Sequence, residues 1–397
     1  MRVTNTSIQE AWLQALATTQ ARLARTQNQV STGLRFSRPA EDPVGAVQVL
    51  DLNRALSQNS QFSRNADFAG NRLALEETTL ARVGDVLQRV RELAVEANNA
   101  TQTNETRAGI ANEVQQALDG LVQLANTQDG NGQYLFAGFS SETQPFTRAG
   151  GSIVYNGDQG QRQLQIGATR LVTDSDNGAA VFQNIRNGNG TFSASAAPTN
   201  TGTGLLGQRS VVDLSQYDGG SYTISFPTPA TFEVRDSANA LVSSGAFTPG
   251  QATAFRGIQV EIGNQPAAGD SFQVAPSASQ DLFATVQNFL DALKTTTSSP
   301  ASQVDVNNRI GNFLTDVDQA LNHMLDVRAQ VGSRLAAVDS QKDINADVDL
   351  HNKSLLSQLQ DLDYADALSR LSLDLTSLEA SQKAFAQTSG LSLFNYL

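Results

Sequence analysis

Apolar residues recur at helical spacing on both flanks of the chain. On the N-terminal side, steps of three and four run through Leu80, Val83, Leu87, Val90, Ala94 and Ala97, and again through Ile110, Val114, Ala117, Leu121 and Leu124. On the C-terminal side, the same spacing runs through Ile310, Leu314, Val317, Leu321, Met324, Val331, Leu335 and Val338, with Arg328 at one apolar position. This last stripe covers about four heptads, which predicts coiled-coil-like packing rather than a lone surface helix.

The middle of the chain has a different period. Residues 145–278 hold seven of the ten prolines and 18 of the 30 glycines. Between these turn residues, apolar and polar positions alternate, as they do around Tyr222, Ile224 and Phe226. Alternation with frequent turns predicts half-buried strands, so we expect an all-β insert. The Gly-, Ser- and Thr-rich residues 188–204 predict a linker between two subdomains, with the division near 187–207.

An insert between two helical flanks constrains the architecture. The flanks must return to each other to bury their apolar stripes. The predicted fold class is therefore α+β and multidomain: a long antiparallel helical bundle, resembling a coiled coil, is built from both termini around an inserted all-β domain. The expected divisions are an N-terminal assembly helix and hinge at 1–42, two halves of a helical core at 43–144 and 279–342, the β insert at 145–278, and a C-terminal assembly helix at 343–397.

The stripes at the two ends of the chain are thinner. Near the N-terminus the leucines lie seven apart, with threonine or glutamine at the intermediate positions. Near the C-terminus the leucines recur but slip in phase near Asp363. Such helices need neighbours, so the ends are expected to pair with each other and with other subunits. The predicted assembly interface consists of Leu16, Leu23, Val30, Leu355, Leu362, Leu371, Leu375, Leu378 and Phe385.

A break separates the N-terminal helix from the next one, in the stretch TGLRFSRPAEDPVGA. Gly33 is suited to end a helix because it takes positive φ at low cost, and Arg35 follows where cations suit exposed carbonyls. Pro39 is expected to stop the first helix. Asp42 is expected to cap the second helix, and Pro43 to occupy its first turn. The pattern predicts a hinge, and an ordinary helix–helix turn is the alternative.

Charge and composition narrow the function. The net charge of −12 argues against general nucleic-acid binding. Residues 1–38 carry five arginines against Glu10, whereas residues 343–397 carry eight acidic residues against three basic ones. These ends either attract each other or present two solvated faces. Cysteine is absent, which excludes disulfides and thiol catalysis. We expect no membrane segment and, if the chain is exported, no cleaved signal.

The motifs give no support to enzymatic chemistry. The two histidines, His323 and His351, lie in helical stretches without metal-ligand spacing. GTGLLG at 202–207 has the glycine pattern of a dinucleotide site but lacks the strand–turn–helix context that such a site needs. DSDNG at 174–178 starts like a calcium loop but has no glutamate at the twelfth position, so we expect a plain turn there. No catalytic, cofactor-binding or metal site is predicted.

Several segments together resemble one family. STGLRFSRPAEDPVGAVQVLDL resembles the hinge signature of flagellin-like axial proteins, in the form found in the flagellar hook-associated protein 3 family. GNGQYLFAGFSSETQPF at 130–146 and VYNGDQGQRQLQIG at 154–167 resemble the segment where that family leaves its helical core. ASQKAFAQTSGLSLFNYL at 380–397 resembles the family's C-terminus, and residues 217–276 resemble a β module of hook-associated proteins.

The resemblance implies a structural role. Members of this family form a ring of identical subunits at the hook–filament junction, between the first hook-associated protein and flagellin. The resemblance also implies unfolded export by the flagellar type III system to the extracellular flagellum, with a cytoplasmic export chaperone on the C-terminal helices. On this basis, residues 5–33 and 350–392 are expected to form an inner antiparallel pair lining a tube. Residues 43–128 and 280–340 are expected to form an outer layer.

Two other functions stay open on the sequence. Flagellin, the filament subunit, shares the helical layout, although flagellins usually end differently from the LSLFNYL tail of this chain. A glycan-binding adhesin would use the β insert, with Tyr217, Tyr222, Phe226 and Phe232 lining a sugar site. At strand spacing, however, aromatic residues are more typical of a core.

Overall fold

The computed structural model describes residues 5–390, with side chains from residue 10 to residue 387. It contains two compact units. The terminal unit comprises Met1–Arg64 and Gln341–Leu397, and the central unit comprises Asn65–Ser340.

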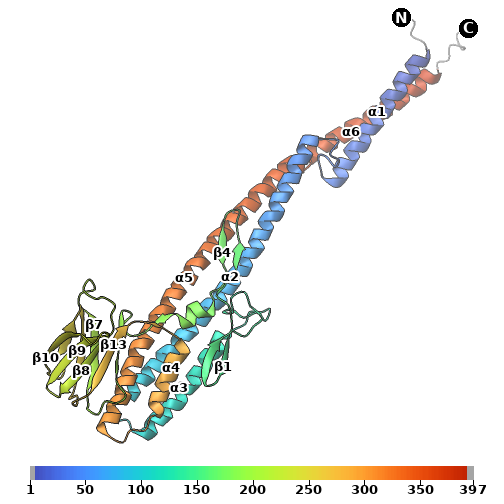
Figure 1. Cartoon of the computed structure of the whole chain (residues 1–397). Helices are drawn as coiled ribbons and strands as arrows, with labels where there is room; N and C mark the ends of the chain where they lie inside the picture. The colour runs from blue at the N-terminus through green and yellow to red at the C-terminus, as the bar shows by residue number, and fades with distance from the viewer. Residues whose placement is uncertain (1–4, 391–397) are drawn as a thin grey trace, which may run out of the picture. The chain divides into compact units, whose positions relative to one another are not determined.

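The described part of the chain forms six α-helices (Figure 1), which are α1 (Asn5–Thr32), α2 (Pro43–Ala97), α3 (Asn104–Ala125), α4 (Leu282–Lys294), α5 (Pro300–Gln360) and α6 (Tyr364–Gly390). Helices occupy both flanks, and the strands lie between α3 and α4. The predicted fold class, helical termini around a β-rich insert, is confirmed. The predicted boundary at 342/343 falls inside the continuous helix α5. The five divisions of the chain that the sequence suggests stay a prediction.

The helices of the central unit share one apolar core. It includes, from the predicted stripes, the buried residues Leu80, Val83, Leu87, Val90, Ile110, Val114, Leu121, Ile310, Val317, Met324, Val331 and Val338. Phe289 of α4 stacks on Phe313 of α5, with ring centroids 4.2 Å apart. Arg328, the polar exception in the α5 stripe, binds Glu77 of α2 at 2.7 Å, so its charge is paired at the edge of the core.

Local signals set the ends of the shorter helices. Thr103 accepts a hydrogen bond from the Thr106 N–H, and the Thr106 side chain accepts one from the Thr103 N–H, which makes a capping box at the start of α3. Asp281 accepts hydrogen bonds from the Phe283 and Ala284 N–H groups at the start of α4. These caps satisfy N–H groups that have no partner within the helix.

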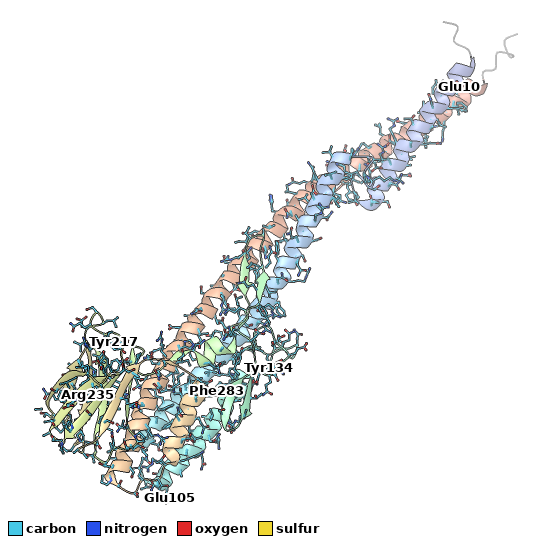
Figure 2. All side chains as sticks on the ribbon, in the orientation of Figure 1. Glu10, Glu105, Tyr134, Tyr217, Arg235 and Phe283 are labelled. Atoms are coloured by element: carbon cyan, nitrogen blue, oxygen red, sulfur yellow. The ribbon has the colours of Figure 1, made fainter. Side chains whose placement is uncertain are left out.

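The chain between α3 and the β head is a set of short hairpins that close the bundle core. The elements are β1 (Phe146–Ala149), β2 (Ser152–Tyr155), β3 (Gln163–Gln165), β4 (Leu171–Thr173), a π-helical turn (Ala179–Gln183) and β5 (Ile185–Arg186), which pairs with β14 (Ser279–Gln280). Phe283 lies on α4 (Figure 2). The ring centroids of Phe146 and Phe182 are 5.0 and 5.7 Å from that of Phe283. Aromatic contacts therefore hold the hairpins on the helices.

Residues 174–178 are not the plain turn that the sequence predicts. Asp174, Asp176 and Asn177 are buried, with exposed fractions of 0%, 8% and 7%. Asp174 pairs with Arg72 and Arg162, and Asp176 pairs with Arg334. The prediction was wrong because the distant arginines that neutralise this acidic stretch are brought to it only by the fold.

Residues 192–276 form a separate two-sheet domain, which we call the β head. Its strands are β6 (Phe192–Ala196), β7 (Leu205–Val211), β8 (Tyr222–Thr228), β9 (Thr231–Asp236), β10 (Leu241–Ala246), β11 (Ala252–Phe255), β12 (Ile258–Gly263) and β13 (Ser271–Pro276). One sheet has the order β10-β9-β8-β13-β6 and the other β11-β12-β7, all antiparallel. Residues 192–196, expected within a linker, are a strand because alternate side chains, Phe192 and Ala194, enter the core of the head.

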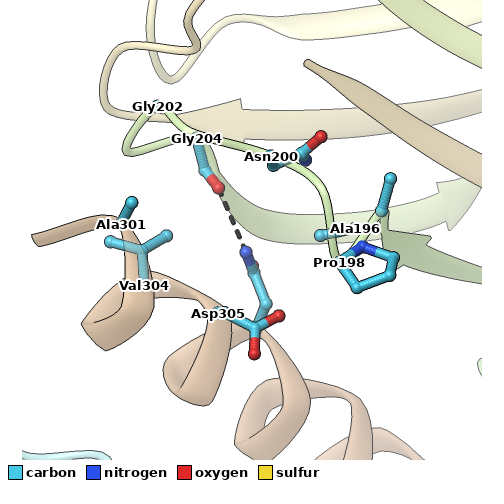
Figure 3. A pocket seen from close by; sticks show the side chains of 10 residues that line it. Ala196, Pro198, Asn200, Gly202, Gly204, Ala301, Val304 and Asp305 are labelled. Carbon is cyan, nitrogen blue, oxygen red and sulfur yellow. Dashed lines mark hydrogen bonds between the residues drawn. The ribbon is translucent and has the colours of Figure 1, made fainter. Parts of the chain in front are cut away.

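Polar side chains of α5 hold the β head. Asn308 is 4% exposed; its Oδ1 accepts the Leu206 N–H at 2.7 Å, and its amide donates to the Gly204 carbonyl at 3.1 Å (Figure 3). The Arg209 guanidinium donates to the Asn312 side chain at 2.6 Å and to Thr315 at 3.1 Å. Because these α5 positions lie on one helix face, a single face of α5 anchors the head.

Two kinds of feature are absent from the part of the chain that the structure describes. None of its helices combines the length and the apolar character that crossing a bilayer requires. Its histidine, aspartate and glutamate side chains form no group of three or more that could hold a metal ion.

Candidate assembly site

The terminal unit has almost no core of its own. Among the hydrophobic side chains that are buried in the described residues, only Phe36, Phe62, Leu362 and Ala367 belong to it. Its helices pack in pairs, α1 with α6 and the first part of α2 with the last part of α5 (Figure 1). A helix in such a pair covers only one face, so most of its surface stays open to further packing.

The pair of α1 and α6 packs along one heptad seam. The less exposed positions include Trp12, Leu16, Thr19, Leu23, Thr26 and Val30 on α1, and Ala367, Leu371, Asp374, Leu378, Ser381 and Phe385 on α6. Both sets step by four and three residues, which is the spacing of knobs-into-holes packing.

The centre of this seam is polar. Thr19 and Thr26 are 5% and 6% exposed, and the Thr26 hydroxyl donates to the Asp374 carboxylate at 3.1 Å. The Thr19 hydroxyl donates to the Ala15 carbonyl at 2.9 Å, and the Thr26 hydroxyl shares its single proton between the Asp374 carboxylate and the Arg22 carbonyl, which is also 3.1 Å away. A seam that buries hydroxyls and a carboxylate gains less from burial than a leucine seam, but it favours one register.

The helical path of the N-terminal part of the chain is interrupted between α1 and α2. We call the connecting residues, 33–42, the joint. Gly33 ends α1 with φ at +72°, and its N–H donates to the Gln29 carbonyl at 2.8 Å. The Asp42 carboxylate accepts the Gly45 N–H at 2.8 Å, which caps α2, and it binds Arg35 at 3.2 Å. Pro43 is the first residue of α2. The side chain of Phe36 is 7% exposed and fills the inside of the joint.

Pro39 does not end α1, contrary to the expectation from the sequence. The helix stops at Thr32, and Pro39 lies in the turn that leads to Asp42. Within that turn, the Glu41 carboxylate accepts the Ser37 N–H at 2.9 Å, and this hydrogen bond holds the pKa of Glu41 below its usual value. Gly33 is sufficient to end the helix because its left-handed conformation turns the chain away.

The helical path of the C-terminal part of the chain is also interrupted, between α5 and α6, and this break lies beside the joint. α5 ends at Gln360 and α6 starts at Tyr364, and Asp363 caps α6 by accepting the Ala365 N–H at 3.0 Å. The Arg35 N–H donates to the Gln360 carbonyl at 2.7 Å, and the Leu362 N–H donates to the Gly33 carbonyl at 2.9 Å. These two backbone hydrogen bonds form an antiparallel bridge, so the two breaks are tied together.

The predicted assembly residues fall into four places. Leu16, Leu23, Val30, Leu371, Leu378 and Phe385 lie in the α1–α6 seam. Leu355 is half-buried on α5, and Leu362 is buried beside the joint. Leu375 is 46% exposed and lies outside the seam. The break at residues 361–363 was not predicted, although the slip in the leucine phase near Asp363 was its signal.

The terminal unit also exposes large apolar side chains that are not part of the predicted assembly interface. They are Leu13, Val44, Val47, Leu50, Ile344, Val348, Leu350, Leu368 and Leu373, with exposed fractions from 41% for Val348 to 70% for Leu350. Covering these side chains with a partner would be favourable, because it removes apolar surface from water.

Comparisons with known proteins agree with this arrangement. Two family models match the flanks: the bacterial flagellin N-terminal helical region over residues 3–141 and the bacterial flagellin C-terminal helical region over residues 314–397. Flagellar hook-associated protein 3 of Escherichia coli K12 is 30% identical over 402 residues, which cover 99% of each chain.

Solved structures match as well. The crystal structure of FlgL from Xanthomonas campestris is 39% identical, with a TM-score of 0.74, and the match covers 77% of this chain and 99% of that one. The flagellar junction protein FlgL from Legionella pneumophila is 29% identical, with a TM-score of 0.72, and the match covers 79% of this chain and 99% of that one.

Proposed function

This chain belongs to the flagellar hook-associated protein 3 family, and from that premise we propose how its terminal unit builds the junction. The protein is a structural component of the bacterial flagellum at the junction between hook and filament. We infer that the seam residues of α1 and α6, the joint and the exposed apolar residues of the terminal unit are together the surface through which copies assemble.

One observation carries this proposal. Among the side chains that the structure describes, the central unit buries an extensive apolar core, whereas the terminal unit buries four hydrophobic side chains and exposes a larger number of others. Pairs of helices with so little buried apolar surface are marginal in water by themselves. Burial of the exposed leucines, valines and isoleucine against neighbours would supply the missing stabilisation, at about 1.5–3 kcal/mol for each fully covered side chain.

The partners follow from the position in the flagellum. We propose contacts with identical copies in a ring, with the first hook-associated protein on one side and with flagellin on the other. A marginal terminal unit without cysteine also suits export of an unfolded chain through the type III channel, with a cytoplasmic chaperone covering the C-terminal helices. The role is structural rather than enzymatic, and its place is extracellular.

The proposal is tested with purified protein added to isolated hooks that carry the first hook-associated protein, viewed by electron microscopy. The full chain is expected to cap the hooks and to permit growth of a flagellin filament. Chains that lack residues 1–33 or 350–397 are expected to leave the hooks bare, while circular dichroism still shows a folded central unit. A truncated chain that caps hooks normally would overturn the proposal.

A pair of point variants sharpens this test. Leu375→Asp places a charge on an exposed leucine of the terminal unit, and we expect it to weaken capping at least tenfold in protein concentration, because a charge at an interface costs more than 1.4 kcal/mol. Leu241→Asp is the matched control, since Leu241 is 55% exposed on the β head, and we expect it to cap as wild type does.

The alternatives are less well supported. The flagellin family models match the helical flanks, whereas the hook-associated relative matches the whole chain. Tyr222 and Phe226, two of the residues that an adhesin would need at its surface, are 3% and 1% exposed in the core of the β head. Seeded polymerisation of the purified protein tests whether it is flagellin. Flagellin would extend the seeds into a filament, whereas a junction protein would stop at a ring.

A further inference from the structure

Two carboxyl groups meet inside the central unit. Glu76 of α2 has an exposed fraction of 0%, and its Oε1 accepts the backbone N–H of Asp176 at 3.1 Å. Its other oxygen, Oε2, is buried without a hydrogen-bond partner. Asp176 is 8% exposed and lies on the segment 174–178 that packs between α2 and α5. A buried carboxylate with an unpartnered oxygen is costly, so its charge state matters.

The nearby cations do not match the carboxylates in number. Arg334 of α5 is the cation that binds Asp176, and it donates to the Asp176 Oδ1 at 3.2 Å. Arg72 binds Asp129 at 2.5 Å and Asp174 at 3.4 Å, and Arg162 binds Asp174 at 2.5 Å. Those two arginines are thus balanced by two carboxylates. A single guanidinium is left for Glu76 and Asp176 together.

The remaining charged neighbours do not alter this balance. Glu77, which follows Glu76 on α2, pairs with Arg328 of α5 at 2.7 Å. The neutral amide of Gln161 donates to the Asp176 Oδ1 at 3.3 Å. With both carboxyl groups ionised, the buried cluster would carry one uncompensated negative charge, and one proton removes it.

We propose that Glu76 is protonated in the folded chain at neutral pH and acts as a latch: its acid group hydrogen-bonds the Asp176 carboxylate and thereby holds the segment 174–178 on α2 and α5. When Glu76 loses the proton, two carboxylates, Glu76 and Asp176, share the single positive charge of Arg334, and the segment 174–178 is released. The latch is closed at neutral and mildly acidic pH and opens in alkaline medium.

The electrostatics agree with this geometry. Burial, reinforced by the charge of Asp176, raises the pKa of Glu76 to about 8, and Arg334 offsets only part of the effect. In the unfolded or opened chain, the carboxyl returns to the ordinary glutamate pKa of about 4.3. Opening therefore releases a proton between these two values, and each pH unit of increase favours the open state by about tenfold until the pH passes the folded-state pKa.

Hydrogen exchange followed by mass spectrometry on the full-length protein tests the latch. In wild type, the peptide that contains residues 173–178 is expected to exchange faster from pH 7 to pH 9, by an excess that approaches tenfold over the same peptide in Glu76→Gln. Glutamine can accept the Asp176 N–H as Glu76 does, and its amide can donate to the Asp176 carboxylate as the proposed acid group would, so Glu76→Gln is expected to stay closed throughout. Glu77→Gln is the matched control, and we expect it to retain the wild-type pH dependence.

Two outcomes would overturn the proposal: wild type without excess exchange at pH 9, or Glu76→Gln with the same pH dependence as wild type. Should Glu76→Gln fail to fold, wild type itself decides. Its infrared difference spectrum between pH 7 and pH 10 must then contain the loss of one protonated carboxyl band, and the absence of that band refutes the latch.

Discussion

At the scale of single residues, the path of the chain through the joint depends on glycines, where a side chain would be strained or would collide with a neighbour. Gly33 adopts φ of +72°, and a Cβ there would lie 2.9 Å from the Tyr364 hydroxyl oxygen. Gly45, in the first turn of α2, is constrained by space rather than by φ, because a Cβ there would lie 2.6 Å from Asp42 Oδ2 and 3.0 Å from the ring of Phe36. The glycine and the aspartate of the joint are recognisable in the sequence, but the aromatic residues that pack on the glycines are not.

The first prediction concerns Gly33. Gly33→Ala is expected to destabilise the terminal unit by about 1–2 kcal/mol, because an L-residue is strained at positive φ, and the contact with Tyr364 adds to this cost. Gly332→Ala is the matched control: Gly332 lies within α5, where a Cβ meets no atom within 4 Å, so about 0.5–1 kcal/mol of stabilisation is expected.

Urea unfolding separates the two glycine variants. The fluorescence of Trp12, the single tryptophan, reports on α1 and should register Gly33→Ala as a lower midpoint. Far-ultraviolet circular dichroism should register Gly332→Ala as a higher one. An unchanged midpoint of the fluorescence transition in Gly33→Ala would show that alanine is not strained in the backbone conformation of residue 33.

At the scale of elements, the α1–α6 pair trades stability for register. Its central seam positions are Thr19, Thr26 and Asp374 where a strong coiled coil has leucine or isoleucine. The helical period of α1 and α6 is visible in the sequence, but the partner of each helix is not, since many pairings satisfy a thin stripe. The threonine–aspartate hydrogen bond shows which alignment is used.

The second prediction concerns this hydrogen bond. The double variant Thr26→Val/Asp374→Leu replaces it with apolar contact, and we expect the α1–α6 pair to gain about 1–2 kcal/mol. Thr26→Val alone is expected to be less stable than the double variant, because it leaves the Asp374 carboxylate without its partner. The midpoint of the Trp12 fluorescence transition measures both effects.

A surface substitution controls for the change in composition. Thr18→Val makes the same replacement at an exposed position of α1, and it should shift the midpoint by less than about 0.5 kcal/mol. A double variant that is less stable than wild type would mean that the hydrogen bond outweighs the apolar contact.

At the scale of the whole molecule, the two units differ in what holds them together. The central unit has a continuous apolar core, aromatic contacts, paired buried charges and a β head anchored on α5. The terminal unit has helix pairs, a joint and few buried apolar side chains. We therefore expect the terminal unit to unfold first when the subunit is isolated, and assembly to stabilise it by mass action.

The third prediction follows from this difference. In urea, the Trp12 fluorescence of the monomer should change at a lower concentration than the far-ultraviolet circular dichroism, giving two non-coincident transitions. In the assembled junction, the fluorescence transition should move to a higher urea concentration. Coincident transitions in the monomer would show that the two units unfold as one cooperative body.

The sequence by itself determined the classes of structure and the family. Apolar spacing separated helical flanks from a β insert because the periods of 3.6 and 2 are properties of the backbone. Gly33, Asp42 and Pro43 predicted a break between helices because each acts locally. Glycine permits positive φ, aspartate accepts free N–H groups at a helix start, and proline fits the first helical turn. Asp281 could have been recognised in the same way, since a helix cap also depends on adjacent residues.

Only the tertiary structure decided the contacts between residues distant in the chain. It showed that the breaks at Gly33 and Leu362 are joined by backbone hydrogen bonds, and that Gly33 rather than Pro39 ends α1. It also showed that the acidic stretch around Asp176 is buried beside Glu76 and Arg334. A linear pattern contains no distance between remote segments, and the cost of burying a charge depends on which opposite charges the fold brings within a few ångströms of it.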